Sequence, residues 1–266
     1  MMKIAAIQMV SGPDVAVNLA RARHWLAEAA AQGARLAALP EYFCLIGLKD
    51  EDKLAIAETP GQGPIQEALA DAARELGLWI IGGTLPLRTT DPARVRNSCL
   101  VWAPDGTQAA RYDKMHLFCY DNGRERYDEG RVLEAGEAPV VAQVEGLRVG
   151  LSVCYDLRFP ELYRGLGPLD LISVPAAFTH TTGQAHWELL LRARAVENLA
   201  YLIAPAQGGT HQNGRRTWGH TMIVDPWGEV LACLPEGEGM VLAEIDAARL
   251  AQLRQQLPAL QHRRLL

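Results

Sequence analysis

Cys154 stands where an apolar strand is expected to turn into a helix. Residues 147–153 read Leu-Arg-Val-Gly-Leu-Ser-Val, and residues 155–161, Tyr-Asp-Leu-Arg-Phe-Pro-Glu, are typical of a turn that enters a helix. A side chain at such an elbow can point into a cleft beside free backbone N–H groups, and a helix N-terminus favours the thiolate. Cys154 is therefore a candidate nucleophile, although a buried structural cysteine fits the same local context.

A free thiol has a pKa near ~8.5 and needs a base or a cation to react at neutral pH. Glu41 directly follows the apolar segment 35–39, where the carboxyl end of a strand can line a ligand crevice, so it is a candidate base. Lys114 follows the strand that ends at Asp113 and is one of only four lysines among 26 basic residues. Its compact ammonium can lie beside a thiolate or a developing oxyanion. Taken singly, Glu41 also fits a solvated loop acid, and Lys114 also fits a surface lysine at a strand end.

The sequence motifs around these three residues resemble those of the nitrilase (carbon–nitrogen hydrolase) superfamily. They are Leu-Pro-Glu-Tyr-Phe around Glu41, Tyr-Asp-Lys-Met-His-Leu-Phe around Lys114 and Gly-Leu-Ser-Val-Cys-Tyr-Asp-Leu-Arg-Phe-Pro-Glu around Cys154. Their order is that of the family's Glu-Lys-Cys triad, and the resemblance runs from Lys3 to about Arg264. Segments within 175–228 and 257–264 are similar to the Nit-type amidase branch, and within it most to deaminated glutathione amidase.

The resemblance implies thiol-dependent hydrolysis of the amide of deaminated glutathione to 2-oxoglutarate and cysteinylglycine, through a thioester. Glu41 would be the base, Cys154 the nucleophile, and Lys114 with the Tyr155 backbone N–H would bind the oxyanion. An ω-amidase that acts on 2-oxoglutaramate, or on a related small dicarboxylate monoamide, is the alternative within this class. A binding protein that keeps the fold without catalysis is a second alternative. A redox-sensing thiol with Cys119 as its resolving partner is a third.

The family also carries a second glutamate and a pocket for the 2-oxo-acid end of its substrate. Glu129, in Tyr-Asp-Glu-Gly, matches that glutamate, but the nearby Glu125 leaves the assignment open. Phe178 and Thr182 match positions that line the pocket. Arg158 lies four residues after Cys154, on the same side of a first helical turn, and could bind a substrate carboxylate or serve only a structural role.

Composition narrows the classes of partner. The chain has 266 residues, of which 49% are hydrophobic and 21% charged, so a sizeable core is expected and disorder is excluded. A net charge of −5 without a basic stripe argues against nucleic acid, and no apolar run approaches the ~20 residues of a membrane span. Five scattered cysteines and no signal-peptide pattern favour the reducing cytoplasm. Metal-ligand spacings and a phosphate loop are missing from the sequence, so we expect neither metal nor cofactor.

Strand and helix signals alternate along the chain without a linker, which predicts one domain over residues 1–266. Helices are expected over 15–32, 64–76, 184–198 and 247–256. Strands are expected over 3–10, 35–39, 78–85, 97–103, 108–112, 140–144, 148–153, 169–177, 201–206, 221–224, 229–234 and 241–245. Hairpins mixed with crossover helices indicate an α/β fold, a four-layer α-β-β-α sandwich of two mixed sheets with helices outside, as in nitrilases. The resemblance also implies a homodimer, with the helices that flank Cys154 at its interface.

Overall fold

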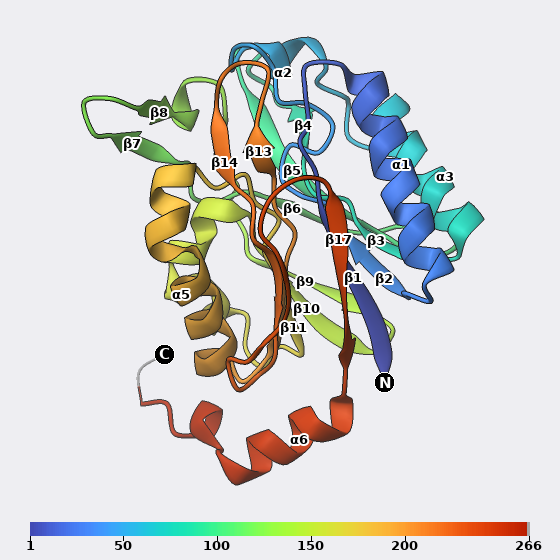
Figure 1. The fold of residues 1–266 in the computed structure, drawn as a ribbon, viewed down its shortest axis with the longest axis vertical. Coiled ribbons are helices and arrows are strands. Elements are labelled where there is room, and N and C mark those ends of the chain that lie inside the picture. Colours follow the sequence, from blue (N-terminus) through green and yellow to red (C-terminus); the bar gives the residue numbers. More distant parts are fainter. Residues whose placement is uncertain (265–266) are drawn as a thin grey trace.

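Two mixed β-sheets form the centre of the molecule in a computed structural model, which describes residues 1–264 (Figure 1). The first sheet has the order β17-β1-β2-β3-β5-β4, and β6 pairs with β5. Its strands are β1 (Met2–Gln8), β2 (Leu36–Ala38), β3 (Trp79–Ile81), β4 (Leu85–Arg88), β5 (Val95–Trp102), β6 (Gln108–Asp113) and β17 (Gly239–Ile245). Strands β1, β2 and β3 are parallel, and the other pairs are antiparallel.

The second sheet has the order β16-β15-β12-β11-β10-β9. Its strands are β9 (Val140–Val144), β10 (Leu147–Leu151), β11 (Leu171–Ser173), β12 (Tyr201–Ala204), β15 (Thr221–Val224) and β16 (Val230–Leu234). Here β10, β11 and β12 are the parallel strands. Each sheet therefore has a parallel centre whose strands end at the same edge, where ligand crevices form in such folds.

Helices cover the outer face of each sheet. Helices α1 (Val15–Ala31) and α3 (Pro64–Leu76) pack on the first sheet through Leu26 and Leu69, which share a buried cluster with Ile80. Helices α4 (Pro160–Gly165) and α5 (His180–Asn198) lie on the second, and α6 (Ala247–Gln256) follows β17. This arrangement confirms the predicted four-layer sandwich. The domain predicted over 1–266 includes two residues that lie outside the described range.

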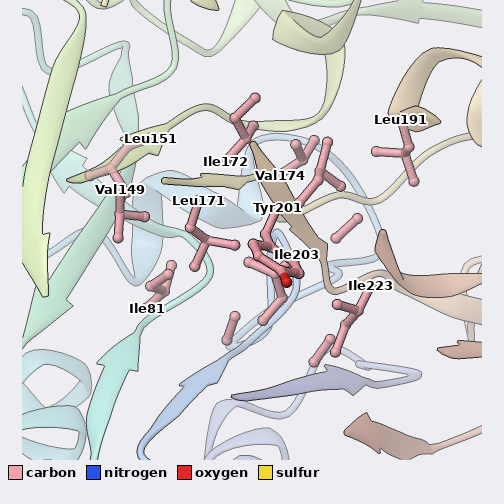
Figure 2. Close-up of a cluster of buried hydrophobic side chains, with 14 of the residues drawn as sticks. Ile81, Val149, Leu151, Leu171, Ile172, Val174, Leu191, Tyr201, Ile203 and Ile223 are labelled. Carbon is pink, nitrogen blue, oxygen red and sulfur yellow. The ribbon is translucent and has the colours of Figure 1, made fainter. Parts of the chain in front are cut away.

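The strand β1 shows how one short sequence contributes to two cores. Ile4 and Ala6 face the second sheet, whereas Ala5 and Ile7 face the helices, because successive side chains of a strand point to opposite sides. Figure 2 shows part of the cluster between the sheets, with Ile81 of the first sheet near Val149 of β10 and Leu171 of β11. Such a strand is apolar on both faces, which explains its continuous hydrophobic run. Among residues 1–264, no helix is both long and apolar enough to cross a bilayer.

Several elements begin and end at the residues that the sequence predicts. The predicted bounds of α3, α6 and β15 match those observed. Pro64 begins α3, and Gly77 ends it in the left-handed conformation, at φ 61°. The predicted strand over 169–177 shrinks to β11, and α5 begins at His180 rather than at residue 184. Residues 174–179 instead form a non-helical segment that enters the functional site.

Several short elements escaped the sequence analysis. They are the helix α2 (Asp52–Ala55), the hairpin β7 (Cys119–Asp121) and β8 (Arg126–Asp128), and the hairpin β13 (Gly208–Thr210) and β14 (Arg216–Trp218). Each has three or four residues, too few to show a hydrophobic period. The Asn-Gly turn of β7–β8 is a hairpin signal that could have been recognised. Figure 1 shows both hairpins and α2 at the same end of the molecule.

The predicted strand over 78–85 is interrupted at Gly82–Gly83, between β3 and β4. Gly83 has φ 53°, and a Cβ atom there would lie 2.1 Å from the carbonyl oxygen of Pro40. Just beyond it, the Thr84 hydroxyl accepts a hydrogen bond from the Tyr42 backbone N–H at 2.9 Å. The break therefore makes room for residues 40–42, which include Glu41.

Replacing Gly83 by alanine should destabilise the protein more than the same change at Gly77. Both glycines have positive φ, but a Cβ at Gly77 meets no atom within 4 Å. Gly77→Ala should lower the free energy of unfolding by about 1–2 kcal/mol through backbone strain alone. Gly83→Ala should add about 1–3 kcal/mol from the clash with Pro40. Urea denaturation measures both, and equal losses would contradict this account of the strand break.

Candidate active site

Three strand ends converge on one small pocket. Glu41 follows β2, Lys114 follows β6 and Cys154 follows β10, so both sheets contribute. All three side chains are buried, and Cys154 is the most exposed at 7%. Glu41 and Cys154 line a small cavity, called the inner pocket below, and Lys114 lies behind it in contact with Glu41. The fold thus brings the three predicted residues together.

The Lys114 ammonium lies between two carboxylates. Its Nζ is 2.9 Å from Glu41 Oε1, and it is 3.0 and 2.8 Å from the two carboxylate oxygens of Glu129. Burial lowers the pKa of Lys114, but the charges of Glu129 and Glu41 outweigh burial and raise this pKa well above its usual value. Lys114 therefore carries a fixed positive charge at any physiological pH and cannot serve as a base.

Glu41 is held in one orientation by neighbours far away in sequence. The Asn97 side-chain amide donates to Glu41 Oε1 at 2.9 Å, and the Ala177 backbone N–H donates to Oε2 at 2.8 Å. The Gln207 side chain donates to the Glu41 backbone carbonyl at 3.1 Å. Sequence reasoning missed both Asn97 and Gln207. A carboxylate so fixed beside the pocket is suited to proton transfer.

The structure favours Glu129 over Glu125 as the second glutamate of the site. Besides Lys114, Glu129 accepts hydrogen bonds from the Tyr42 hydroxyl at 2.9 Å and from the Phe118 backbone N–H at 2.7 Å. Burial raises the pKa of Glu129, but the Lys114 charge and these donors outweigh it and lower this pKa below its usual value. Glu125 instead accepts a hydrogen bond from the Thr181 hydroxyl at 2.9 Å.

Cys154 occupies a strained elbow after β10. Its φ of 50° lies in the left-handed region, which is uncommon for a residue other than glycine, and its N–H donates to the Pro175 carbonyl at 2.9 Å. Asp156, fully buried, accepts from the Val153 N–H at 2.8 Å and from the Tyr112 hydroxyl at 2.7 Å. The elbow is thereby tied to β6, the strand that leads to Lys114.

The expectation that a helix N-terminus lowers the thiol pKa is wrong for this site. Burial and the nearby Glu41 charge raise the pKa of Cys154 well above its usual value, and Lys114 opposes them without prevailing. The helix that begins at Cys154 is a single 3₁₀ segment, Cys154–Arg158, too short for a strong dipole. The thiol is therefore neutral at rest.

Two of the three predicted substrate residues line the inner pocket. Phe178 and Thr182 form part of its wall, together with Tyr155. Arg158 is not part of that wall. Its guanidinium carbon lies 5.7 and 5.4 Å from the ring centres of Tyr155 and Phe178, and Nη1 is 3.3 Å from His186 Nδ1. Its predicted contact with substrate stays a prediction.

Arg215 also lines the inner pocket, and sequence reasoning did not single it out. It lies between the strands β13 and β14, in a segment where its neighbours give no pattern that marks a binding residue. The hairpin packs against α5, and a hydrogen bond from Arg215 Nη2 to the Ala177 backbone carbonyl brings Arg215 near the site.

A family model described as carbon–nitrogen hydrolase matches residues 3–255. The chain belongs to the carbon–nitrogen hydrolase family. This carbon–nitrogen hydrolase is 42% identical over 265 residues to the deaminated glutathione amidase of a Synechocystis species, with 97% of each chain covered. It is 38% identical to the omega-amidase NIT2 of Homo sapiens, over 98% of this chain and 95% of that relative.

The fold likeness agrees with this assignment. The carbon–nitrogen hydrolase chain matches the crystal structure of the C. elegans NitFhit protein with a TM-score of 0.90 at 38% identity. The match covers 99% of this chain and 65% of that longer one. The family likeness stated from the sequence is thus confirmed.

Exchanging Glu129 for glutamine should reduce stability in a pH-dependent way. Because the folded protein lowers the pKa of Glu129, the carboxylate stabilises the fold above its unfolded pKa of about 4.3, and this contribution disappears as the pH falls through the lower folded value. Glu129→Gln should cost about 1–3 kcal/mol near neutral pH and progressively less in acid. Chemical denaturation across pH measures the difference.

The matched control for this change is Glu125→Gln, which removes a carboxylate that lines the surface cleft next to the site. Glu125→Gln should change the free energy of unfolding by no more than ~0.5 kcal/mol. A Glu129→Gln cost that grows as the pH falls would contradict the role given to Lys114.

Proposed function

We propose that this carbon–nitrogen hydrolase is a thiol-dependent amidase that hydrolyses deaminated glutathione to 2-oxoglutarate and cysteinylglycine. The observation that carries the proposal is that Glu41 and Cys154 line one pocket while Lys114, behind it, donates a hydrogen bond to Glu41. The similarity to deaminated glutathione amidases over nearly the whole chain supports the choice of substrate.

In the first half of the reaction, Glu41 takes the proton of Cys154 as the sulfur attacks the amide carbon. Proton removal and attack must be concerted, since the thiol pKa is raised. The oxyanion that forms is bound by the Tyr155 backbone N–H and by Lys114. The three N–H donors of the Lys114 ammonium are directed at Glu41 Oε1 and at both Glu129 oxygens, so Lys114 gives up one of its two contacts with Glu129 when it binds the oxyanion. Glu41 then gives its proton to the departing nitrogen, the C–N bond breaks and the 2-oxoglutaryl thioester remains.

In the second half, water attacks the thioester carbon while Glu41 accepts one of its protons. The tetrahedral intermediate is stabilised by the same two donors, and it collapses with loss of the sulfur, which recovers its proton from Glu41. The product is a carboxylate, and the enzyme returns to its starting state. Glu129 does not exchange protons in this scheme, because it is engaged by Lys114, Tyr42 and Phe118. It keeps Lys114 charged and in place.

The alternative substrate, 2-oxoglutaramate, is favoured by the 38% identity to omega-amidase NIT2. Both substrates would form the same 2-oxoglutaryl enzyme and differ only in the leaving group, which is cysteinylglycine or ammonia. The acyl side of the pocket therefore cannot separate them. Rates of cysteinylglycine and ammonia release by the purified protein would do so.

We also propose a homodimer in the cytoplasm. Helix α5, which follows the site segment 174–179, exposes Leu189 and Val196, and Trp227 is exposed as well. Val196 packs against Gly228, the residue after Trp227, and a contiguous exposed apolar patch marks a protein interface. Light scattering should give twice the 29.1 kDa of one chain. A reducing compartment would keep the nucleophilic thiol free.

Mixing the protein with deaminated glutathione and quenching with acid within the first turnovers should trap an acyl group on Cys154. Intact and peptide mass spectrometry should find one 2-oxoglutaryl group there, since the proposed intermediate is a thioester. The Cys154→Ala variant should show no adduct and no hydrolysis, and the exposed Cys119→Ala should behave as the wild type. Hydrolysis that persists in Cys154→Ala, or an adduct on another residue, would refute the mechanism.

A further inference from the structure

Two cavities of the molecule meet at Arg215. The inner pocket holds Glu41 and Cys154, and a cleft of about 630 Å³, called the outer cleft here, lies beside it. Arg215 lines both. Tyr42 lines the outer cleft and donates to Glu129, which lines the inner pocket. A substrate bound at Cys154 can therefore extend past Arg215 into the outer cleft.

The outer cleft is basic although the chain as a whole is acidic. Four separate segments line it: the residues from Tyr42 to α2, the β7–β8 hairpin, the first residues of α5 and the β13–β14 hairpin. Figure 1 shows α2 and the two hairpins at one end of the molecule. Its basic side chains are Lys49, Lys53, Arg124, Arg126, Arg215 and Arg216, against only Asp50 and Glu125. The net charge of the whole chain is −5. A cleft of this sign attracts anionic ligands.

Arg215 itself is poised for an anion. Its Nη2 donates to the backbone carbonyl of Ala177 at 3.1 Å rather than to a carboxylate, and its guanidinium lies over the Tyr127 ring, 5.2 Å from the ring centre. Nε is buried and has no hydrogen-bond partner within residues 1–264. A guanidinium has five N–H donors in a planar fork that fits a carboxylate. A buried donor left unpaired is costly, so a bound carboxylate would repair this defect.

We propose that the outer cleft binds the leaving-group half of the amide substrate and that Arg215 holds its carboxylate. The ligand class is an amide whose nitrogen carries a short, anionic, peptide-like group, and the inference rests on the proposed amidase function. Ammonia needs no such cleft, and the acyl group common to both candidate substrates is assigned to the inner pocket, which Phe178 and Thr182 line. The outer cleft therefore sets the preference for a substituted amide over a primary one.

The test compares deaminated glutathione with its analogue in which the glycine carboxylate is an uncharged carboxamide. The wild type should prefer the carboxylate form in kcat/KM. Arg215→Ala should reduce that preference about 10–100-fold, the size expected for a charged hydrogen-bonded pair, mainly through KM. Turnover of 2-oxoglutaramate should change far less. Arg215→Lys keeps the charge but loses the planar fork, so its preference for the carboxylate form should lie between those of the wild type and Arg215→Ala.

Arg94→Ala is the matched control, because it removes an exposed arginine that pairs with Asp91 outside both cavities. It should leave the preference unchanged, and circular dichroism should confirm that each variant is folded. Equal losses on the carboxylate, the carboxamide and 2-oxoglutaramate would overturn the inference while leaving the amidase intact. A wild type that hydrolyses none of the three would refute the proposed function, and the inference with it.

Discussion

The ammonium of Lys114, buried between Glu41 and Glu129, is the interaction on which the site depends. Removing three charges from water costs several kcal/mol for each, and only mutual attraction and hydrogen bonds can offset that cost. Here every partner is supported: Asn97 and Ala177 donate to Glu41, and Tyr42 and Phe118 donate to Glu129. With two carboxylates and one ammonium, the cluster is negative overall. Its charge disfavours a thiolate beside it, which is why Glu41 has to act as the base.

The rest of the fold holds this cluster in place. The strands that lead to Glu41 and Cys154 come from different sheets, so the site exists only when the two sheets are packed together. The break at Gly82–Gly83 admits the segment that carries Glu41. Asp156 joins the elbow at Cys154 to Tyr112 of β6. Core packing and active-site geometry are thus coupled, and a loss of either should affect the other.

Much of this arrangement could be predicted from the sequence. The order of Glu41, Lys114 and Cys154 in characteristic words identified the family, and proline and glycine fixed the ends of α3. The rest depends on contacts between distant segments. Gln207 reaches the Glu41 carbonyl across 166 residues, and no local pattern points to it. The choice between Glu129 and Glu125 is likewise set by which one the Phe118 N–H meets.

The prediction that the pKa of the Cys154 thiol is lowered was wrong for a similar reason. Local sequence showed a turn before a helix, but the pKa of Cys154 is governed by burial and by Glu41, which lies on the other sheet. Arg215 was missed because the hairpin that carries it has strands of only three residues each. Sequence motifs thus identify the catalytic residues. The direction of the thiol pKa and the extent of the substrate site follow only from the packed structure.

The chemistry proposed for this site requires a neutral Cys154 thiol at rest beside a permanently charged Lys114. Titrating the ultraviolet absorbance of the thiolate, as the difference between the wild type and Cys154→Ala, measures this directly. The account predicts no Cys154 thiolate at neutral pH, with its signal rising only above the ~8.5 of a free thiol. A thiolate signal that is already complete below neutral pH would contradict it, because the site would then hold a preformed thiolate–ammonium pair.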